Sequence, residues 1–474
     1  MANQVSRRGL LASGGRTAAA VLAGRACGAW LPAALAQNVH GANDRVGLGL
    51  IGCGRRGMQL LEHALAIADV VVPVVCDVDQ SRCEAAADRI AKAGKPKPVI
   101  TKEFREVVDH AAVNGVLITT PDHWHMVQLL HACAARKDAY VEAPIAYNIS
   151  EAGAMAFIAR KYNRVVQVGQ QYRSSPAFHE AVERVQSRRL GRIAQTRTWT
   201  FARLEPIARQ PDEPAPSGLD YDRWLGPAPL RPYNPARVGE HFAEWWDYSG
   251  GRICQWNVHL QDLVHTAMKT NAPKSVVAVG GNIGLQDFRE TPDTLEAVFE
   301  YEGVYGPFIH VYSLRLSNAQ AAWGPPAPPP NSQTDSGRPM HSGMQFHGDQ
   351  GTLFADWDRI ITFDPDGQPV PTRGSPTTRP AARSVPSDTF TQAHLADFVN
   401  CLVTRAEPKA PIESGQFALL PCHLANIAYR LGRKVYFDPA GGQCFKDAAR
   451  KTPDPEANVL KLRAYRHPYG PPNV

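Results

Sequence analysis

The sequence predicts an α/β protein with two parts. The first is an N-terminal Rossmann domain with a doubly wound parallel sheet, and the second is a C-terminal α+β domain with a large, mostly antiparallel open sheet. Residues 44–170 alternate short, continuously apolar strands with helical segments, which is typical of a parallel sheet covered by helices on both faces. After about residue 190 the apolar segments become longer and strand-like. The chain of 474 residues is long enough to bury two cores.

The first part opens with the apolar run VGLGLIG, which ends in glycine. Each apolar run is followed by a segment whose apolar residues recur at helical spacing, so we expect parallel strands joined by crossover helices. Strands are expected at 46–52, 70–79, 115–122, 139–144 and 165–169, and helices at 58–67, 80–93 and 125–137.

The second part contains one strong helical pattern, at 251–270, among its strands. Two proline-rich stretches, 324–339 and 364–387, are expected to be loops. Two later helical patterns, at 394–407 and 417–432, are expected to pack back on the body of the protein. Strands are expected at 192–203, 274–283, 294–303, 308–316, 343–356 and 359–367. We therefore predict a doubly wound domain at 44–170, a second, α+β domain at 171–440, and a tail at 441–474.

Residues 1–36 have the composition of an export signal. Ser6-Arg7-Arg8-Gly9-Leu10-Leu11 resembles a twin-arginine signal, and Ala34-Leu35-Ala36 fits a small-residue cleavage site. A disordered basic N-terminus is the alternative. Because twin-arginine export moves folded proteins, we expect a periplasmic or otherwise exported protein that folds, and loads any non-covalent cofactor, before translocation.

The composition argues against two classes of protein. The chain is 44% apolar and 20% charged, as in ordinary soluble domains. Four arginines of the leader account for most of the net charge of +6, which leaves no basic stripe for nucleic acid. Outside the leader, no segment reaches the roughly 18 apolar residues of a membrane span, so no stable membrane anchor is expected.

The cysteines outside the leader show neither a C-x-x-C pair nor zinc-ligand spacing. Buried free thiols are expected, with a disulfide as the alternative in an exported protein. No metal site is expected, because the pattern places no third ligand near His123 and His125. The cysteines concerned are Cys53, Cys76, Cys83, Cys133, Cys254, Cys401, Cys422 and Cys444.

A dinucleotide site is predicted at residues 52–57, which read G-x-G-x-x-G between a strand and a helix. Gly52 permits the tight turn, Gly54 lets a pyrophosphate approach the backbone, and Gly57 lets the helix pack closely on the strand. Asp77, at the end of the next strand, is placed to accept hydrogen bonds from a ribose, which favours NAD. Arg82 keeps NADP as the alternative.

Nine segments together resemble the Gfo/Idh/MocA family, most of all its exported twin-arginine members. They are GLIGCGRRG, CDVD, TTPDHWH, YVEAP, QVGQQYRSS, GLDYDRWLGPAPLRPYNP, WDYSGG, ETPDTLEAVFEY and CHLANIAYRLGR. The resemblance covers nearly the whole chain after the leader. It implies a Rossmann domain, a C-terminal domain whose open sheet often mediates homo-oligomers, and a tightly held nicotinamide cofactor. Typical members oxidise or reduce sugars, inositols and related polyols.

The resemblance also implies roles for residues. The loop at 120–125 lines the nicotinamide side, Glu142 and Pro144 match the ends of a Glu-Lys-Pro motif, and His259 matches the histidine of an Asp-x-x-x-His helix. The candidates for cofactor binding are Gly52, Cys53, Gly54, Arg55, Arg56, Gly57, Asp77, Thr120, Pro121, His123 and Glu142. The candidates for catalysis are His259, Gln255, Tyr172 and His125. The candidates for substrate binding are Asp122, Trp124, Arg173, Tyr248 and Trp256.

Two positions depart from that pattern. Ala143 stands where the family has the lysine, and Gln255 stands where it has the aspartate. The lysine would stabilise a developing alkoxide, and the aspartate would hold and charge the histidine. Each loss typically costs about 10²–10⁴ in rate, and the two need not be additive.

Three functions therefore stay open. The first is an NAD(P)-dependent oxidoreductase on a sugar or polyol with a rearranged catalytic set. The second is a redox-assisted glycoside hydrolase, lyase or epimerase that uses NAD transiently. The third is a non-catalytic nucleotide or sugar-binding protein. An introduced Ala143 that traps a complex is a further explanation of the motif.

Overall fold

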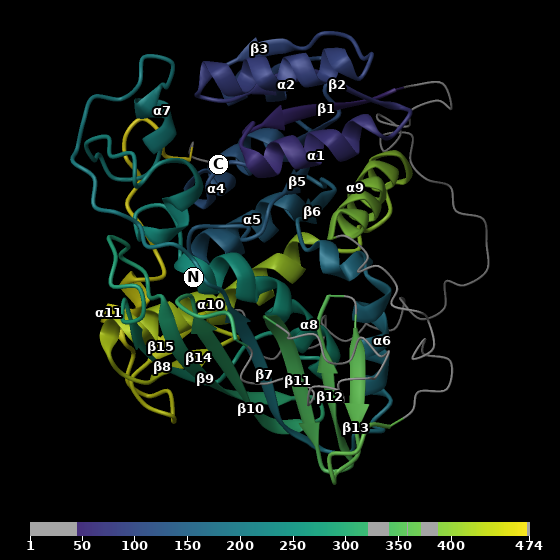
Figure 1. Ribbon diagram of the computed structural model, residues 1–474, viewed down its shortest axis with the longest axis vertical. Helices are drawn as coiled ribbons and strands as arrows, with labels where there is room; N and C mark the ends of the chain where they lie inside the picture. The colour runs from purple at the N-terminus through teal and green to yellow at the C-terminus, as the bar shows by residue number, and fades with distance from the viewer. Residues whose placement is uncertain (1–44, 321–340, 358, 371–386, 472–474) are drawn as a thin grey trace, which may run out of the picture. The chain divides into compact units, whose positions relative to one another are not determined.

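The computed structural model describes residues 45–320, 341–357, 359–370 and 387–471. The predicted export signal and most of both proline-rich stretches lie outside these residues. The described part contains two sheets, drawn in purple to blue and in teal to yellow in Figure 1. Within it, no helix combines the length and hydropathy that a membrane crossing requires.

The first sheet has six parallel strands in the order β3-β2-β1-β4-β5-β6, as a Rossmann domain requires. Strands β1, β4 and β5 are buried along their whole length, which explains why their sequences are continuously apolar or small rather than alternating. The short edge strand β3 was not predicted. The strands are β1 (Val46–Ile51), β2 (Val70–Cys76), β3 (Val99–Thr101), β4 (Gly115–Ile118), β5 (Asp138–Val141) and β6 (Val166–Val168).

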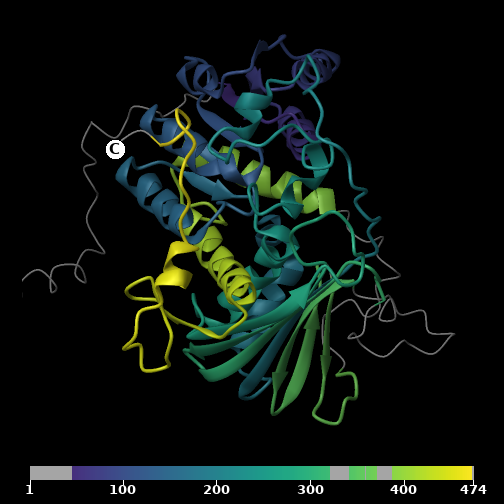
Figure 2. The same cartoon turned by 90° about the vertical axis from the view of Figure 1, so that its left-hand side faces the viewer.

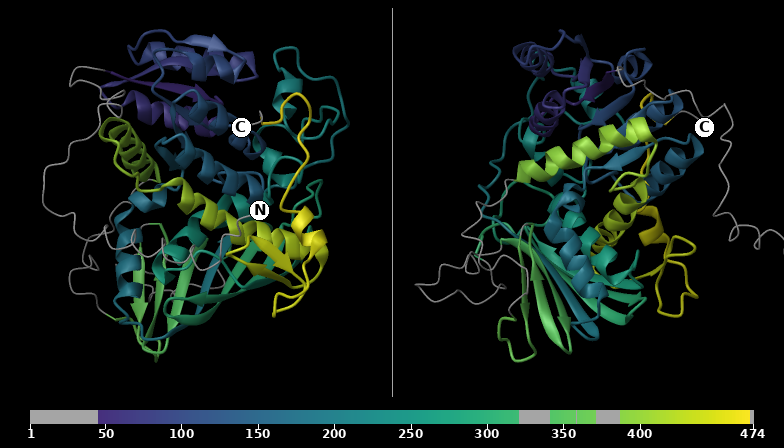
Figure 3. Two further views of the ribbon diagram at one scale, coloured as in Figure 1. Left: turned by 180° about the vertical axis from the view of Figure 1, so that it is seen from behind. Right: turned by 90° about the vertical axis from the view of Figure 1, so that its right-hand side faces the viewer.

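The predicted helices of this part form, each within a few residues of its expected bounds. They and the short α3 are α1 (Arg55–Leu65), α2 (Gln80–Lys92), α3 (Phe104–Asp109), α4 (Asp122–Ala134) and α5 (Ile149–Lys161). A helix from much later in the chain, α9 (Ser387–Thr404), packs beside α1, as Figure 3 shows. Its Leu395 and Phe398 join the same buried cluster as Leu50 and Leu60, so the core of the first sheet is completed from beyond residue 170.

The second sheet has nine strands in the order β13-β12-β11-β7-β10-β9-β8-β14-β15. All neighbours are antiparallel except β7 and β10, which confirms the prediction of a large, mostly antiparallel sheet. The strands are β7 (Ile193–Phe201), β8 (Ser275–Gly281), β9 (Thr294–Gly303), β10 (Gly306–Arg315), β11 (Ser342–Gly348), β12 (Gly351–Ala355), β13 (Ile360–Phe363), β14 (Val435–Asp438) and β15 (Gln443–Phe445). The domain boundaries at 170 and 440 stay predictions. Helix α9 belongs to the second predicted domain but packs on the first sheet, and strand β15 lies in the predicted tail but belongs to the second sheet.

Helices pack on one face of this sheet and lie between it and the first sheet (Figures 1 and 2). The predicted helix at 251–270 is two elements, a π-helical segment η4 (Ile253–Asn257) followed by α8 (Val258–Met268). The other helices are η2 (Gln171–Ser174), α6 (Pro176–Gln186), α7 (Tyr221–Leu225), η3 (Gly239–Glu244), α10 (Ile412–Leu431) and α11 (Pro455–Val459).

Candidate functional site

The glycine loop has the geometry that a dinucleotide site needs. Gly52 has φ +96°, a backbone conformation that favours glycine. A Cβ on Gly57 would lie 1.9 Å from the Gly52 carbonyl oxygen, so only glycine lets α1 approach β1 this closely. A Cβ on Gly54 would meet nothing nearer than 3.6 Å, and no side chain caps the start of α1. Open space and unpaired N–H groups thus meet at the helix N-terminus, where a pyrophosphate binds.

Asp77 follows β2 and braces this loop. Its carboxylate accepts hydrogen bonds from the backbone N–H of Cys53 at 2.7 Å and of Asp79 at 2.9 Å. Burial raises the pKa of Asp77, while these two hydrogen bonds act in the opposite direction. The carboxylate is therefore fixed at the loop, where it can still accept a bond from a ribose hydroxyl.

A cavity of about 440 Å³ extends from the loop to the corner that contains Ala143. It collects most of the predicted cofactor residues together with part of the predicted catalytic and substrate sets. Of the residues predicted, it is lined by Gly52, Cys53, Gly54, Arg55, Arg56, Asp77, Thr120, Pro121, Asp122, Trp124, His125, Glu142, Gln255 and Trp256. Gly57, His123, Tyr172, Arg173, Tyr248 and His259 do not line it.

The corner around Ala143 holds a cation from the glycine loop. Nε of Arg56 donates to Oε1 of Glu142 at 2.8 Å, and Nη1 donates to Gln59 at 2.6 Å. The third nitrogen, Nη2, is buried and has no hydrogen-bond partner in the described part of the chain. Burial lowers the pKa of Arg56, but the Glu142 carboxylate outweighs this and raises it. A permanent positive charge with a spare donor therefore lies beside the position that lacks the lysine.

Asp122 is the second unusual group. It is 2% exposed and lies at the first residue of α4. Oδ2 accepts a hydrogen bond from Ser249 Oγ at 2.5 Å, and Nε2 of Gln255 lies 2.9 Å from both carboxylate oxygens. Burial raises the pKa of the Asp122 carboxyl to about 7, although both donors act to lower it. The carboxyl can therefore gain or lose a proton near neutral pH.

His259 lies outside the cavity, next to Tyr172 and Trp357. Its ring contacts Tyr172 edge to face at 5.3 Å, and Tyr172 stacks on Trp357 at 4.0 Å. Burial and the positive charge of Arg56 lower the pKa of His259 to about 3, so the imidazole is neutral at physiological pH. Gln255 lines the cavity beside Asp122, whereas His259 lies with Tyr172 and Trp357, so the two predicted catalytic residues are not brought together.

The other predicted histidines are engaged by the backbone. His125 lies within 3.0 Å of the Pro144 carbonyl and 2.7 Å of the Thr120 carbonyl, so it ties the two strand-end loops together. Nε2 of His123 lies 3.0 Å from the Trp224 carbonyl. Burial lowers the pKa of both rings.

Two predicted substrate residues have internal partners. Arg173 forms a two-pronged ion pair with Asp262, with both N–O distances at 2.7 Å. Tyr248 is fully buried and packs against Trp224 and His123. The structure therefore places both side chains in the packing around the cavity.

The sequence interpretation did not single out Ser249, Arg252 or Tyr469. Ser249 belongs to the segment WDYSGG and Arg252 directly follows it, so that motif was the signal that could have found them. Tyr469 lines the cavity from near the end of the described chain and contacts Trp124 edge to face at 5.7 Å. No pattern connects it to the site.

The described residues include all eight cysteines outside the leader. The eight cysteines outside the leader are free and buried, which confirms the expected thiols. Within the part of the chain that the structure describes, no group of three His, Cys, Asp or Glu side chains is arranged to hold a metal ion.

The cavity fits a nicotinamide dinucleotide. The open backbone at Gly54 and the uncapped start of α1 suit the pyrophosphate, and Asp77 suits the adenosine ribose. Thr120, Pro121 and Glu142 line the continuation of the cavity toward Ala143, where a nicotinamide ring would end.

Comparison with known proteins agrees with this geometry. Residues 46–170 match the oxidoreductase family's NAD-binding Rossmann fold, and residues 194–287 match its C-terminal alpha/beta domain. A glycosyl hydrolase family 109 protein of Shewanella baltica is 30% identical over 112 residues, which are 23% of this chain and 24% of that protein. An alpha-N-acetylgalactosaminidase of Shewanella oneidensis is 30% identical over 110 residues, 22% of this chain and 24% of that protein. The chain thus matches about a quarter of the length of these relatives.

Solved structures share the whole fold at low identity. The aldose-aldose oxidoreductase of Caulobacter crescentus has a TM-score of 0.59 at 17% identity, over 83% of this chain and 100% of that chain. The WlbA dehydrogenase of Bordetella pertussis, solved with NADH and UDP-GlcNAcA, has a TM-score of 0.58 at 16% identity, over 83% and 99%. With the Rossmann domain and the C-terminal domain both matched in order, the chain belongs to the Gfo/Idh/MocA oxidoreductase family.

Proposed function

We propose that the protein is an NAD-dependent oxidoreductase that acts on a hydroxyl of a sugar or polyol, with Asp122 as the proton acceptor. One observation carries the proposal. The Asp122 carboxylate meets Gln255 inside the cavity, so an acid from the Rossmann side reaches the helix position at which the family pattern has its own aspartate. NADP is the alternative cofactor, and Asp77 favours NAD.

Asp122 has the properties of a general base. Ser249 and Gln255 fix its two oxygens, and its pKa of about 7 leaves much of it ionised near neutral pH. When bound, NAD⁺ supplies the hydride acceptor. As the substrate carbon is oxidised, Asp122 would accept the proton of its hydroxyl, which would leave a carbonyl product and a protonated Asp122 carboxyl.

Arg56 supplies the positive charge that Ala143 lacks. Its guanidinium is held by Glu142 at the same corner, and its buried Nη2 has no partner among the described residues. A fixed cation at this place stabilises the alkoxide that develops as the hydroxyl loses its proton. The rearranged set therefore pairs Asp122 with Arg56.

The experiment is an assay of the purified protein for bound NAD(H), followed by a panel of sugars and polyols. The proposal expects a bound nucleotide and an absorbance change in the reduced-nicotinamide band with at least one class of sugar. A protein that carries no nucleotide and responds to no sugar would instead be a binding protein.

Redox-assisted glycoside hydrolysis is the second candidate, favoured by the 30% identity to glycosyl hydrolase family 109 proteins over part of the chain. In that reaction a sugar hydroxyl is oxidised, the neighbouring C–H becomes acidic, the aglycone is eliminated, and water addition and reduction restore the sugar and NAD⁺. It predicts release of the leaving group from an aryl glycoside with solvent deuterium in the sugar and no net NADH. Cleavage without deuterium uptake would argue against it.

We also propose export to the periplasm and a homo-oligomer formed through the second sheet. The leader sequence supports export. Val277, Val279 and Ile309 support the oligomer, because strand register places them on one face of β8 and β10 and their exposed fractions are 36%, 72% and 36%. Light scattering of the mature protein measures the oligomer, and a strict monomer would contradict it.

A further inference from the structure

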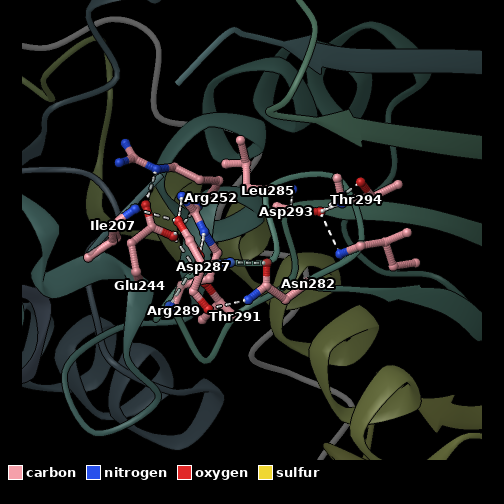
Figure 4. Close-up of polar contacts among 12 residues, drawn as sticks. Ile207, Glu244, Arg252, Asn282, Leu285, Asp287, Arg289, Thr291, Asp293 and Thr294 are labelled. Carbon is pink, nitrogen blue, oxygen red and sulfur yellow. Dashed lines mark hydrogen bonds and ion pairs between the residues drawn. The ribbon is translucent and has the colours of Figure 1, made fainter. Parts of the chain in front are cut away.

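Arg252 lines the cavity, and its side chain is fixed by Glu244, which does not line the cavity. Its Nε donates to Oε1 of Glu244 at 2.5 Å, and Glu244 is fully buried. The second oxygen of Glu244 accepts from Arg289 Nη1 and from Thr291 Oγ1, each at 3.1 Å. Figure 4 shows this cluster, with the Arg252 guanidinium extending from it. The position of Arg252 is thus set by a carboxylate that is itself fixed.

The cluster behind Arg252 is balanced in charge. Arg289 pairs with Asp287 through two contacts of 2.8 Å, and Asp287 also accepts from the backbone N–H of Ile207 at 2.8 Å. Two acids, Glu244 and Asp287, therefore face two arginines. Glu244 takes only Nε of Arg252, because its second oxygen is occupied by Arg289 and Thr291.

The Nη1–Nη2 edge of Arg252 is left for the cavity. Neither atom has a hydrogen bond within the described residues, and Figure 4 shows both pointing away from the cluster. The side chain is 17% exposed and lines the cavity. Two coplanar N–H donors on one edge are the geometry that binds a planar carboxylate with two hydrogen bonds.

Trp256 and Gln255 locate this edge relative to the reaction. The Arg252 guanidinium lies 5.6 Å from the ring centre of Trp256, which also lines the cavity. Gln255, on the same π-helical segment as Trp256, touches Asp122. Arg252, Trp256 and Gln255 thus belong to one wall of the cavity, and a sugar whose acidic substituent meets Arg252 would lie near the Asp122 carboxyl that Gln255 contacts.

The rest of the cavity lining agrees with an anionic substrate. The whole lining contains seven arginine or lysine residues, Arg252 among them, and five aspartate or glutamate residues, so its formal charge is positive. Arg56 is paired with Glu142, and Arg223 is paired with Asp220 at 2.6 Å. Arg252 differs from Arg56 because its acid does not line the cavity, and from Arg223 because its own pairing uses Nε and leaves both Nη atoms free within the described residues.

From the clamped Glu244–Arg252 pair, the free guanidinium edge and the adjoining Trp256, we propose that the substrate is an acidic sugar whose carboxylate is bound by Arg252. This rests on the proposed function and names its substrate class. A sulfate ester has the same charge and offers oxygens to the same edge, so the test compares the two.

The test measures binding by calorimetry on the NAD-loaded protein, so that it does not depend on turnover. The probes are methyl hexuronides, the neutral methyl hexosides of the same configuration, and the 6-O-sulfates of those hexosides. At least one hexuronide should bind about ten- to a hundredfold more tightly than its neutral counterpart, as expected for a two-pronged charge-assisted contact. A sulfate that binds most tightly, or equal binding of neutral and acidic sugars, would overturn the assignment.

Variants separate recognition from folding. Arg252→Gln should abolish the preference, and Arg252→Lys, which keeps the charge of the buried cluster, should retain the fold and lose most of the preference. Arg223→Gln, a second arginine of the cavity wall, should leave the preference unchanged. A preference that survives in Arg252→Lys at full size contradicts the proposal. Oxidation of neutral sugars only would refute the acidic substrate and leave the oxidoreductase function standing.

Discussion

At the scale of single residues, Asp122 sets the expected pH dependence of the reaction. If its carboxylate is the base, kcat/KM for oxidation rises with pH through about 7 and then levels off. His259, with a pKa of about 3, cannot produce this limb. Asp122→Asn should lower kcat/KM by about 10²–10⁴ and remove the limb. Ser249→Ala, which removes a donor to the carboxylate, should move the limb to higher pH. A limb that is unchanged in Asp122→Asn would identify another base.

The same carboxyl should also affect stability. Its pKa in the folded protein is about 7, above the ordinary value of 3.8, so the folded state binds more protons than the unfolded state between these values. Stability from this group therefore falls as pH rises from about 4 to 7 and stays low above 7. Asp122→Asn should remove this fall. Thermal melts of both proteins from pH 5 to 8 measure this fall in stability. If the melting temperatures of the two proteins changed in parallel with pH, Asp122 would already be ionised throughout this range.

Arg56 should be interchangeable with the absent lysine. Arg56→Gln is expected to lower kcat/KM by about 10²–10³, because the developing alkoxide loses its cation. Adding Ala143→Lys to that variant should restore part of the activity, and Ala143→Lys alone is the matched control. Full activity in Arg56→Gln would show that the cation takes no part.

At the scale of elements, the contact between α1 and β1 decides whether the loop forms. Gly57→Ala places a Cβ 1.9 Å from a backbone oxygen, so α1 must shift, at a cost of about 1–3 kcal/mol. Gly54→Ala meets no atom closer than 3.6 Å and should keep the fold while weakening NAD binding. Melting without NAD followed by NAD titration separates the two effects. Equal losses of stability in both variants would contradict this division of roles.

The strands and the glycine loop could be predicted because their signals are local. An apolar run such as β1 or β9 shows its period in its own residues, and G-x-G-x-x-G fixes a turn by the same few positions. The π turn before α8 could not, because the apolar residues of 251–270 are compatible with one helix and do not distinguish a π turn from an α turn. The packing of α9 beside α1 could not be predicted either, because an apolar helix face does not show which core the helix covers.

The residues of the candidate site also divide into those that the sequence predicts and those that it does not. The loop residues and Asp77 follow from motif spacing, whereas the contact of Asp122 with Gln255 joins residues 133 positions apart. Arg252 and Glu244 are close in sequence, yet the role of Glu244 depends on Arg289 and Thr291 from a separate loop. Such pairings arise only when segments that are separate in the sequence pack together in the folded chain.

At the scale of the whole molecule, the cavity wall combines the first sheet with α7, η3 and η4 from later in the chain, so NAD should stabilise the contact between these parts of the fold. At a concentration of 100 times its Kd, a ligand adds about 2.7 kcal/mol to the free energy of unfolding. We expect a rise in Tm with NAD and a smaller one with NADP, whose phosphate would approach the Asp77 carboxylate. Differential scanning fluorimetry with both cofactors measures this, and a larger rise with NADP would reverse the assignment.

The return of residues 460–471 to the first sheet has a consequence for protein synthesis. Arg463 bonds Glu151 at 2.6 Å, Arg466 bonds Asp222 at 2.5 Å, and Tyr469 closes a side of the cavity. This segment leaves the ribosome after both sheets have been made. A nascent chain halted before residue 455 would already contain its glycine loop but would lack one wall of the nucleotide cavity. We therefore expect lasting capture of the cofactor only after this segment has been made, and NAD retention by a chain truncated before residue 455 would contradict this.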